Sequence, residues 1–130
     1  MEQRFVYADH SATTGVRPEV LEAMLPYLKE EYGNPSSIYK KARSAKEALE
    51  KARDQVAKAI GARNATEVFF TGSGTEADNW ALKGIFEAYG NKGNHIITTA
   101  VEHHAILHTC DYLEKVRGAK ITYLPVDAEG

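Results

Sequence analysis

The feature that most constrains the fold of this chain is an apolar run that leads through two glycines into a helix. It spans residues 68–79, with the sequence VFFTGSGTEADN. Its first four residues are typical of a buried strand, which Gly72 and Gly74 bring to an end. Ser73 followed three residues later by Glu76 is a capping-box pattern. The run therefore predicts a strand, a glycine-rich turn and the N-terminus of a helix.

A turn of this kind presents backbone N–H groups at the start of a helix. The missing side chains of Gly72 and Gly74 let a ligand approach closely, and the helix dipole favours an anion. A phosphate group is the expected ligand. The same pattern also fits two glycines that only make a tight turn. Other residues of the chain are needed to decide between these two interpretations.

Composition excludes several classes of protein. The 130 residues are enough for one domain with one core. A balance of 16 basic and 18 acidic residues, with a net charge of −2, predicts neither direct nucleic-acid binding nor an anionic-membrane surface. No apolar run approaches the roughly 18 residues of a membrane span, and the start has no apolar signal region. The single cysteine, Cys110, excludes an internal disulfide, and a cytoplasmic location is expected.

Two helices are predicted before the opening feature. Apolar periodicity predicts the first from Pro18 to about Tyr32, with Pro26 inside it expected to kink or shorten it. The second and longer helix is predicted from about Ser37 to Ile60, with a narrow apolar stripe. That stripe consists of Ala42, Ala45, Leu49, Ala52, Val56 and Ala59.

Helices then alternate with strands. After the first strand and its helix, which ends near Tyr89, we predict a strand at 95–99, a helix at about 105–117 and a strand at 120–124. Crossovers of this length imply an α/β fold whose parallel strands are joined by right-handed helical connections. The helix before Tyr89 is expected to pack on the sheet with one face, formed by Ala77, Trp80, Ala81, Gly84, Ile85 and Ala88.

Ligands of such sheets bind beyond the carboxyl ends of the strands. This rule places residues 72–75 and the loop at residues 100–104 on the same edge. For the chain as a whole we expect an N-terminal arm and loop at 1–15, a helical segment at 16–62 and an incomplete three-layer α/β domain at 63–130.

Dinucleotide binding is one chemistry that this edge could support. Gly72-x-Gly74-x-x-Ala77 formally satisfies the dinucleotide fingerprint. The acidic residue expected about 20 positions later is missing, because Glu102 comes late and after a loop. A nucleotide-binding P-loop is excluded, since no Gly-Lys-Ser/Thr follows the glycines.

A metal site is a second possibility. His104 and His108 lie four residues apart, on one helical face, close to Glu102 and His103. The His-Glu-x-x-His hydrolase motif is absent, and Cys110 belongs to the apolar side of the helix. We therefore predict no metal, with these histidines facing solvent or capping the helix.

The third chemistry that this edge could support is that of a phosphate-bearing aromatic cofactor, above all pyridoxal 5′-phosphate. Such a site needs a phosphate cradle, a flat side chain over the pyridine ring, an acid and a lysine. Gly74 and Thr75 can provide the cradle, and His103 at the same edge can provide the stacking face. The acid and the lysine are not identifiable in the sequence.

Four blocks of the sequence together resemble the cysteine desulfurases, pyridoxal-phosphate enzymes of the class V aminotransferase group. The blocks are YADHSATT at 7–14, GNPSS at 33–37, FTGSGTEADN at 70–79 and Glu102-His103. They occur in the family's order and span nearly the whole chain. The resemblance implies the N-terminal part of the large domain of the fold-type I pyridoxal-phosphate transferases.

The resemblance also implies roles for individual residues. Gly74 and Thr75 would hold the cofactor phosphate, and His103 would stack on the pyridine ring and assist proton transfers. The family's substrate is L-cysteine, which is converted to alanine. Its sulfur passes as a persulfide to acceptor or scaffold proteins that serve iron–sulfur cluster assembly or tRNA thiolation. The family's members are homodimers.

Family members are about three times longer than this chain. The Schiff-base lysine and the persulfide-forming cysteine are therefore expected downstream of residue 130, and the isolated chain is expected to be inactive. Cys110 does not match the family's nucleophile and is expected to be a buried helix residue. The alternatives are a non-catalytic half-domain without cofactor, or another pyridoxal-phosphate enzyme of the class V aminotransferase type.

Overall fold

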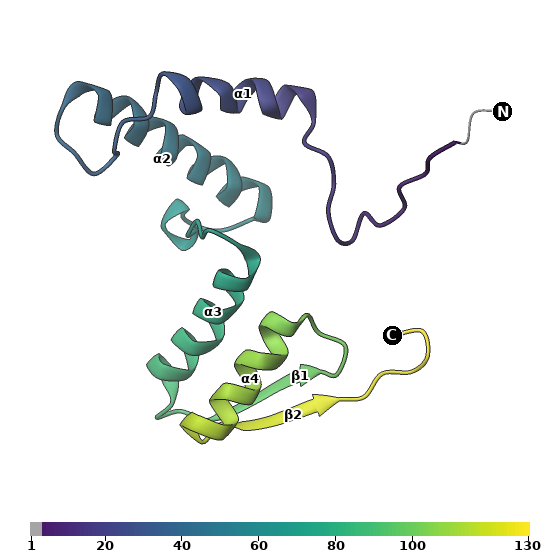
Figure 1. Ribbon diagram of the computed structural model, residues 1–130. Helices are drawn as coiled ribbons and strands as arrows, with labels where there is room; N and C mark the ends of the chain where they lie inside the picture. The colour runs from purple at the N-terminus through teal and green to yellow at the C-terminus, as the bar shows by residue number, and fades with distance from the viewer. Residues whose placement is uncertain (1–3) are drawn as a thin grey trace. The chain divides into compact units, whose positions relative to one another are not determined.

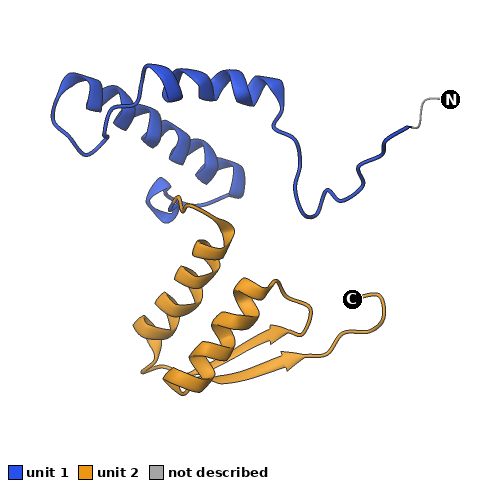
Figure 2. Ribbon diagram, in the orientation of Figure 1, with its two compact units in different colours: residues 1–69 blue, residues 70–130 orange. Residues whose placement is uncertain are grey.

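The computed structural model describes residues 4–130, so the first three residues of the expected N-terminal arm lie outside the described residues. The chain divides into two compact units, residues 1–69 and residues 70–130 (Figure 2). The three segments expected from the sequence, at 1–15, 16–62 and 63–130, are not tested by this division and stay predictions.

The described residues of unit 1, 4–69, contain three helical elements (Figure 1): α1 (Pro18–Lys29), α2 (Lys40–Ile60) and the 3₁₀ turn η1 (Ala65–Glu67). α1 ends before the predicted Tyr32, and the N–H of Glu30 closes its last turn on the carbonyl of Pro26. α2 begins later than predicted, at Lys40. It ends at Gly61, whose φ of 72° is the left-handed conformation that favours glycine at a helix C-terminus.

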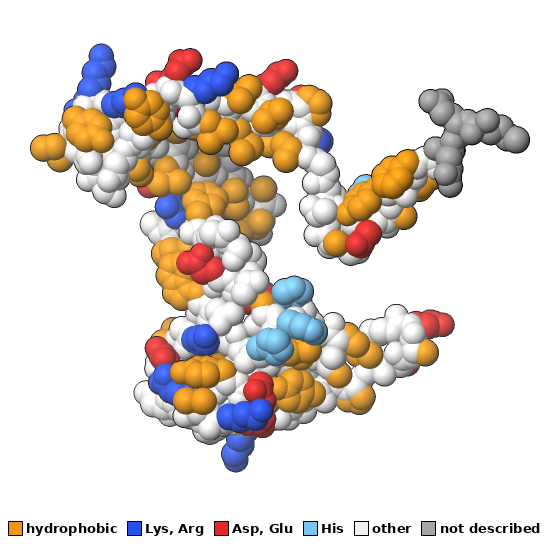
Figure 3. All heavy atoms as spheres, in the orientation of Figure 1, with side chains coloured by type: hydrophobic (Ala, Val, Ile, Leu, Met, Phe, Trp, Pro, Cys, Tyr) orange, Lys and Arg blue, Asp and Glu red, His pale blue; other side chains and the backbone are white. Residues whose placement is uncertain are grey.

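The predicted apolar stripe of α2 is correct at its start and wrong at its end. Ala42 is fully buried, but near the C-terminus Ala57 is buried whereas Val56 is 37% exposed. η1 packs on α2, and the apolar spacing of the sequence did not indicate this contact. α1 buries none of its side chains, and its apolar residues lie on the surface (Figure 3).

The connection from α1 to α2 requires a glycine at residue 33. A Cβ at Gly33 would lie 2.5 Å from the carbonyl oxygen of Lys41, closer than a Cβ atom comes to another heavy atom in proteins. Ser44, in α2, donates a 2.7 Å hydrogen bond from its Oγ to the carboxylate of Glu31, just after the end of α1. The block GNPSS thus brings the chain directly against the first turn of α2.

Unit 2 contains α3 (Gly74–Tyr89), β1 (His95–Thr99), α4 (His104–Arg117) and β2 (Lys120–Leu124). The two strands are parallel and in register from His95↔Lys120 to Thr99↔Leu124, with α4 as their crossover. Parallel strands with a helical connection confirm the predicted α/β class. None of the helices among the described residues is long and apolar enough to cross a membrane.

The core of unit 2 lies beneath α4. Leu113 and Cys110 are completely buried, and Thr109 is buried beside them. α4 packs on β2 and on α3. Val116 follows Leu113 by three residues and so belongs to the same apolar periodicity, but it lies in the last turn of α4 and is 62% exposed.

The strand predicted at residues 68–71 is wrong. The segment is not a strand, although Val68 is buried and its backbone is extended, with φ −101° and ψ 124°. Within the described residues the sheet has two strands, β1 and β2. An extended segment becomes a strand only when its N–H and C=O groups pair with a neighbour, and neither β1 nor β2 pairs with this one.

The packing face predicted for α3 is also wrong. α3 packs on α4 rather than on the sheet, and Asn79 and Lys83 lie on the side that faces α4. Trp80 is 54% exposed and Ile85 61% exposed, on the face that was expected to be covered. Small and apolar residues along one side of a helix indicate which face can be buried, but not which element lies there.

Candidate functional site

The turn before α3 is closed by hydrogen bonds of its own side chains. Ser73 is the N-cap residue, and its Oγ accepts a 3.2 Å hydrogen bond from the N–H of Glu76. The Glu76 carboxylate in turn accepts a 2.6 Å hydrogen bond from the N–H of Gly72. The predicted capping box is therefore present, with its reciprocal bond displaced by one residue from Ser73 to Gly72.

The first two residues of α3 leave room for a ligand. The N–H groups of Gly74 and Thr75 belong to the first turn, so they have no acceptor inside the helix. A Cβ placed on Gly74 would meet no heavy atom within 4 Å. Thr75 is exposed, and its carbonyl accepts a 3.0 Å hydrogen bond from the Asn79 side chain. Two backbone donors and one hydroxyl thus lie together in open space at the positive end of the helix dipole.

His103 is held in one orientation at the start of α4. It is the N-cap residue of that helix, and its Nδ1 accepts a 3.1 Å hydrogen bond from the N–H of Ala105. In the neutral ring this bond places the proton on Nε2. The preceding residue, Glu102, is fixed to the end of β1 by a 3.1 Å hydrogen bond from Thr99 Oγ1. His103 therefore presents an exposed, oriented imidazole just beyond a strand's carboxyl end.

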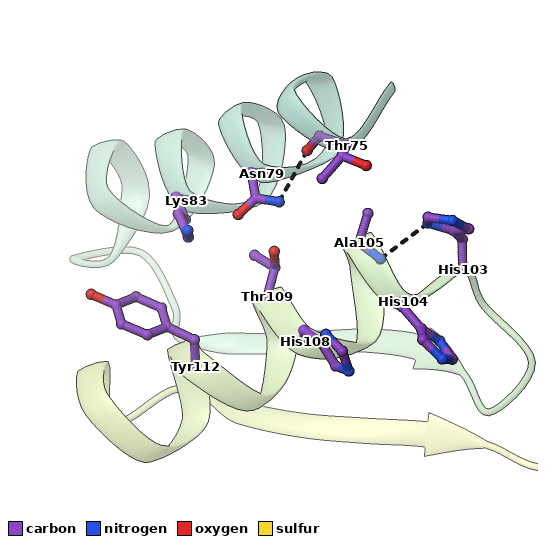
Figure 4. Close-up of a pocket in the computed structure, with 9 residues that line it drawn as sticks. All are labelled: Thr75, Asn79, Lys83, His103, His104, Ala105, His108, Thr109 and Tyr112. Carbon is purple, nitrogen blue, oxygen red and sulfur yellow. Dashed lines mark hydrogen bonds between the residues drawn. The ribbon is translucent and has the colours of Figure 1, made fainter. Parts of the chain in front are cut away.

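A groove of about 470 Å³ lies between α3 and α4 (Figure 4). It contains Thr75 and His103 at one end, and Lys83 and Tyr112 at the other. The full lining is Thr75, Asn79, Lys83, His103, His104, Ala105, His108, Thr109 and Tyr112. The structure thus brings two of the three predicted site residues to one groove. The third, Gly74, directly precedes Thr75 but is not part of the lining.

Five lining residues were not singled out from the sequence: Asn79, Lys83, Ala105, Thr109 and Tyr112. Helical spacing contains the signal for two of them, because Thr75, Asn79 and Lys83 follow one another at intervals of four on α3. The Lys83 Nζ lies 5.0 Å from the centre of the Tyr112 ring, within cation–π range. This end of the groove is therefore cationic and aromatic.

His104 and His108 line the same groove (Figure 4), and both are exposed. Their ring centroids are 5.1 Å apart. In the part of the chain that the structure describes, no group of three or more His, Cys, Asp or Glu side chains is arranged to hold a metal ion.

Cys110 lies on the buried side of α4, with 0% of its surface exposed. Burial raises the pKa of its thiol, and the negative charges of Glu102 and Glu114 raise it further. Because the reactive form of cysteine is the exposed thiolate, this side chain is unsuited to nucleophilic chemistry. The expectation of a buried helix residue is confirmed.

Comparison with known proteins adds a family and several relatives. The family model described as Aminotransferase class-V matches residues 6–130. The cysteine desulfurase IscS of Clostridium botulinum (strain Kyoto / Type A2) is 60% identical over 125 residues, which are 96% of this chain and 31% of that protein. The chain therefore spans about a third of the length of the curated relatives it matches.

Two solved structures resemble the chain over most of its length. A NifS-like protein has a TM-score of 0.84 and 44% identity, over 92% of this chain and 32% of its own. A structure described as SspA in complex with cysteine has a TM-score of 0.82 and 36% identity, over 91% of this chain and 33% of its own.

Proposed function

Because this chain belongs to the class V aminotransferase family, we propose that it forms one wall of the active site of a pyridoxal-phosphate-dependent cysteine desulfurase. The observation that carries the proposal is that Thr75 and His103, from the starts of two different helices, line one groove. The high identity to a cysteine desulfurase over 96% of this chain supports the same activity. The related structure described as a complex with cysteine supports L-cysteine as the substrate.

The residues present fit the phosphate end of pyridoxal 5′-phosphate. Gly74 has open space where a Cβ would lie, and its N–H and that of Thr75 have no acceptor inside the helix. A dianionic phosphate accepts such hydrogen bonds well at a helix N-terminus. When bound, this cofactor supplies a conjugated ring that withdraws electrons from the bonds of an attached amino acid.

Each residue has a separate task in this proposal. Gly74 and Thr75 bind the phosphate through backbone N–H groups and the Thr75 hydroxyl. His103 offers its flat face to the pyridine ring, and its orientation is fixed by the hydrogen bond from Ala105. The Nε2 atom of His103 faces away from that hydrogen bond and is available to hold or pass a proton.

The proposed reaction transfers sulfur from one thiol to another. The C–S bond of L-cysteine breaks, the amino acid leaves as alanine, and the sulfur atom joins the thiol of a cysteine in the protein as a persulfide. Cys110 is too deeply buried for that role. We propose a homodimeric, cytoplasmic enzyme that passes the persulfide to acceptor or scaffold proteins of iron–sulfur cluster assembly or tRNA thiolation.

The test is an assay of products. The purified protein that carries this chain is supplied with pyridoxal phosphate, L-cysteine and dithiothreitol, and alanine and sulfide are measured. We expect both in equal amounts from the wild type, with a large loss for His103→Ala. In a second assay with an added keto acid, transfer of the amino group to that acid without release of sulfide would indicate another class V aminotransferase activity. No cofactor uptake at all would indicate a non-catalytic half-domain.

A further inference from the structure

Glu76 makes two hydrogen bonds to the turn that leads into α3, through two different parts of the residue. Its backbone N–H donates to Ser73 Oγ at 3.2 Å, and its carboxylate Oε2 accepts from the N–H of Gly72 at 2.6 Å. The same oxygen lies 3.2 Å from the point where a Cβ on Gly72 would be. The side chain of Glu76 is therefore folded back over Gly72, while the backbone N–H of the same residue bonds to Ser73.

This arrangement divides the N–H groups of the turn between two acceptors. Glu76 takes the N–H of Gly72 and Ser73 takes that of Glu76, whereas Gly74 and Thr75 lie between them without an acceptor in the helix. The N–H groups of Gly72 and Glu76 are thus held by acceptors, and the two available N–H groups lie between them in the sequence. Loss of either hydrogen bond would let the turn open, so that the Gly74 and Thr75 N–H groups would no longer point in one fixed direction.

We propose that Glu76 is a positioning residue that holds the Gly74 and Thr75 donors in place for the cofactor phosphate. The proposal rests on the phosphate site proposed above, and it adds a residue that does not touch the phosphate itself. Thr71 supports the same turn, since its Oγ1 donates a 2.9 Å hydrogen bond to the carbonyl of Ser73.

The charge of Glu76 acts in the opposite direction to its hydrogen bond. A carboxylate in the same turn repels a dianionic phosphate, whereas the bond to Gly72 keeps the turn in the shape that binds it. These two effects separate in different side chains. Gln keeps an acceptor oxygen at the same reach and removes the charge. Asp keeps the charge on a side chain one carbon shorter, which cannot reach Gly72 from residue 76. Ala removes both.

The experiment measures binding of pyridoxal phosphate and of inorganic phosphate by titration calorimetry to wild type, Glu76→Gln, Glu76→Ala and Glu76→Asp. We expect Gln to bind as tightly as wild type or more tightly. Ala should bind on the order of tenfold more weakly, because a charge-assisted hydrogen bond is lost, and Asp more weakly still. The Gly72 amide resonance in ¹⁵N NMR spectra should move in the Ala and Asp variants and return towards its wild-type position in the Gln variant.

The outcomes separate this proposal from the proposed function. Equal affinity of all four proteins, with wild type binding the cofactor, would overturn the role of Glu76 and leave the phosphate site intact. Failure of Gln to restore what Ala loses would also overturn it. If wild type binds neither compound, the phosphate site itself is wrong, and the role of Glu76 falls with it.

Discussion

The backbone N–H of Ala105 donates a hydrogen bond to Nδ1 of His103 across 3.1 Å. This one contact both caps α4 and orients the imidazole that borders the groove. The His103 side chain therefore both caps the helix and provides the ring that borders the groove. Substitutions at residue 103 therefore change stability and binding together, unless the new side chain is chosen to separate them.

His103→Asn separates them, because Asn is a strong N-cap residue without a ring. We expect His103→Ala to lower the free energy of unfolding by about 1 kcal/mol and His103→Asn to recover most of that loss. Both variants should bind pyridoxal phosphate more weakly than wild type, since neither has a stacking face. Urea unfolding and cofactor titration measure the two effects. Normal cofactor binding by the Asn variant would exclude a stacking role for His103.

Thr75→Ala should weaken retention of the cofactor by roughly 1.5–3 kcal/mol, the range for a hydrogen bond to a charged group. Thr75→Ser is the matched control, because it keeps the hydroxyl and removes only a methyl group. Equilibrium dialysis of the two variants against pyridoxal phosphate gives the comparison. If the Ala variant retains the cofactor as well as wild type, the backbone N–H groups hold the phosphate without help from the hydroxyl.

Gly118→Ala should destabilise unit 2 by about 1 kcal/mol. Gly118 ends α4 with a φ of 72°, a left-handed conformation that a residue with a Cβ adopts only at a cost. Gly93→Ala is the control in the same unit, since Gly93 has no positive φ and its added Cβ would meet nothing within 4 Å. Urea unfolding curves that are equally shifted for both variants would contradict this account of the α4 terminus.

Cys110 should resist alkylation in the folded protein and react once the chain is unfolded. Its thiol is buried and its pKa is raised, so the folded state favours the protonated form. The direction of the pH dependence follows because folding and proton binding by this thiol are linked. Above about pH 8.5 the unfolded chain loses this proton before the folded chain does, so stability from this group falls as the pH rises towards the folded pKa. Iodoacetamide labelling followed by mass spectrometry, with and without urea, measures the protection.

The local elements of unit 2 follow from short-range signals in the sequence. Residues 95–99 and 120–124 are the two strands as predicted, and the helix between them differs only by its first residue. Gly118 marks a helix end because its left-handed conformation is a local requirement. The strand predicted at 68–71 failed because pairing depends on a neighbour that periodicity does not reveal.

The candidate site was predictable only where local signals mark its residues. Gly74 and Thr75 are recognisable because a glycine turn and a capping residue indicate a helix N-terminus. His103 is recognisable because it closely follows a predicted strand, at the edge of the sheet where ligands bind. Asn79 and Lys83 line the groove because α3 turns that side towards α4. The sequence predicted the opposite packing face for α3, so these two residues were missed. Which faces of two helices meet is a tertiary result.

Backbone amide resonances report directly whether the N–H groups of Gly74 and Thr75 bind a phosphate. ¹H–¹⁵N NMR spectra of the ¹⁵N-labelled chain are recorded with pyridoxal phosphate, with inorganic phosphate and with pyridoxal, which has no phosphate. We predict that both phosphate compounds shift the Gly74 and Thr75 amides, and that pyridoxal leaves these two amides unchanged. Gly74 and Thr75 amides that stay unmoved in the presence of pyridoxal phosphate would contradict a phosphate site at the start of α3.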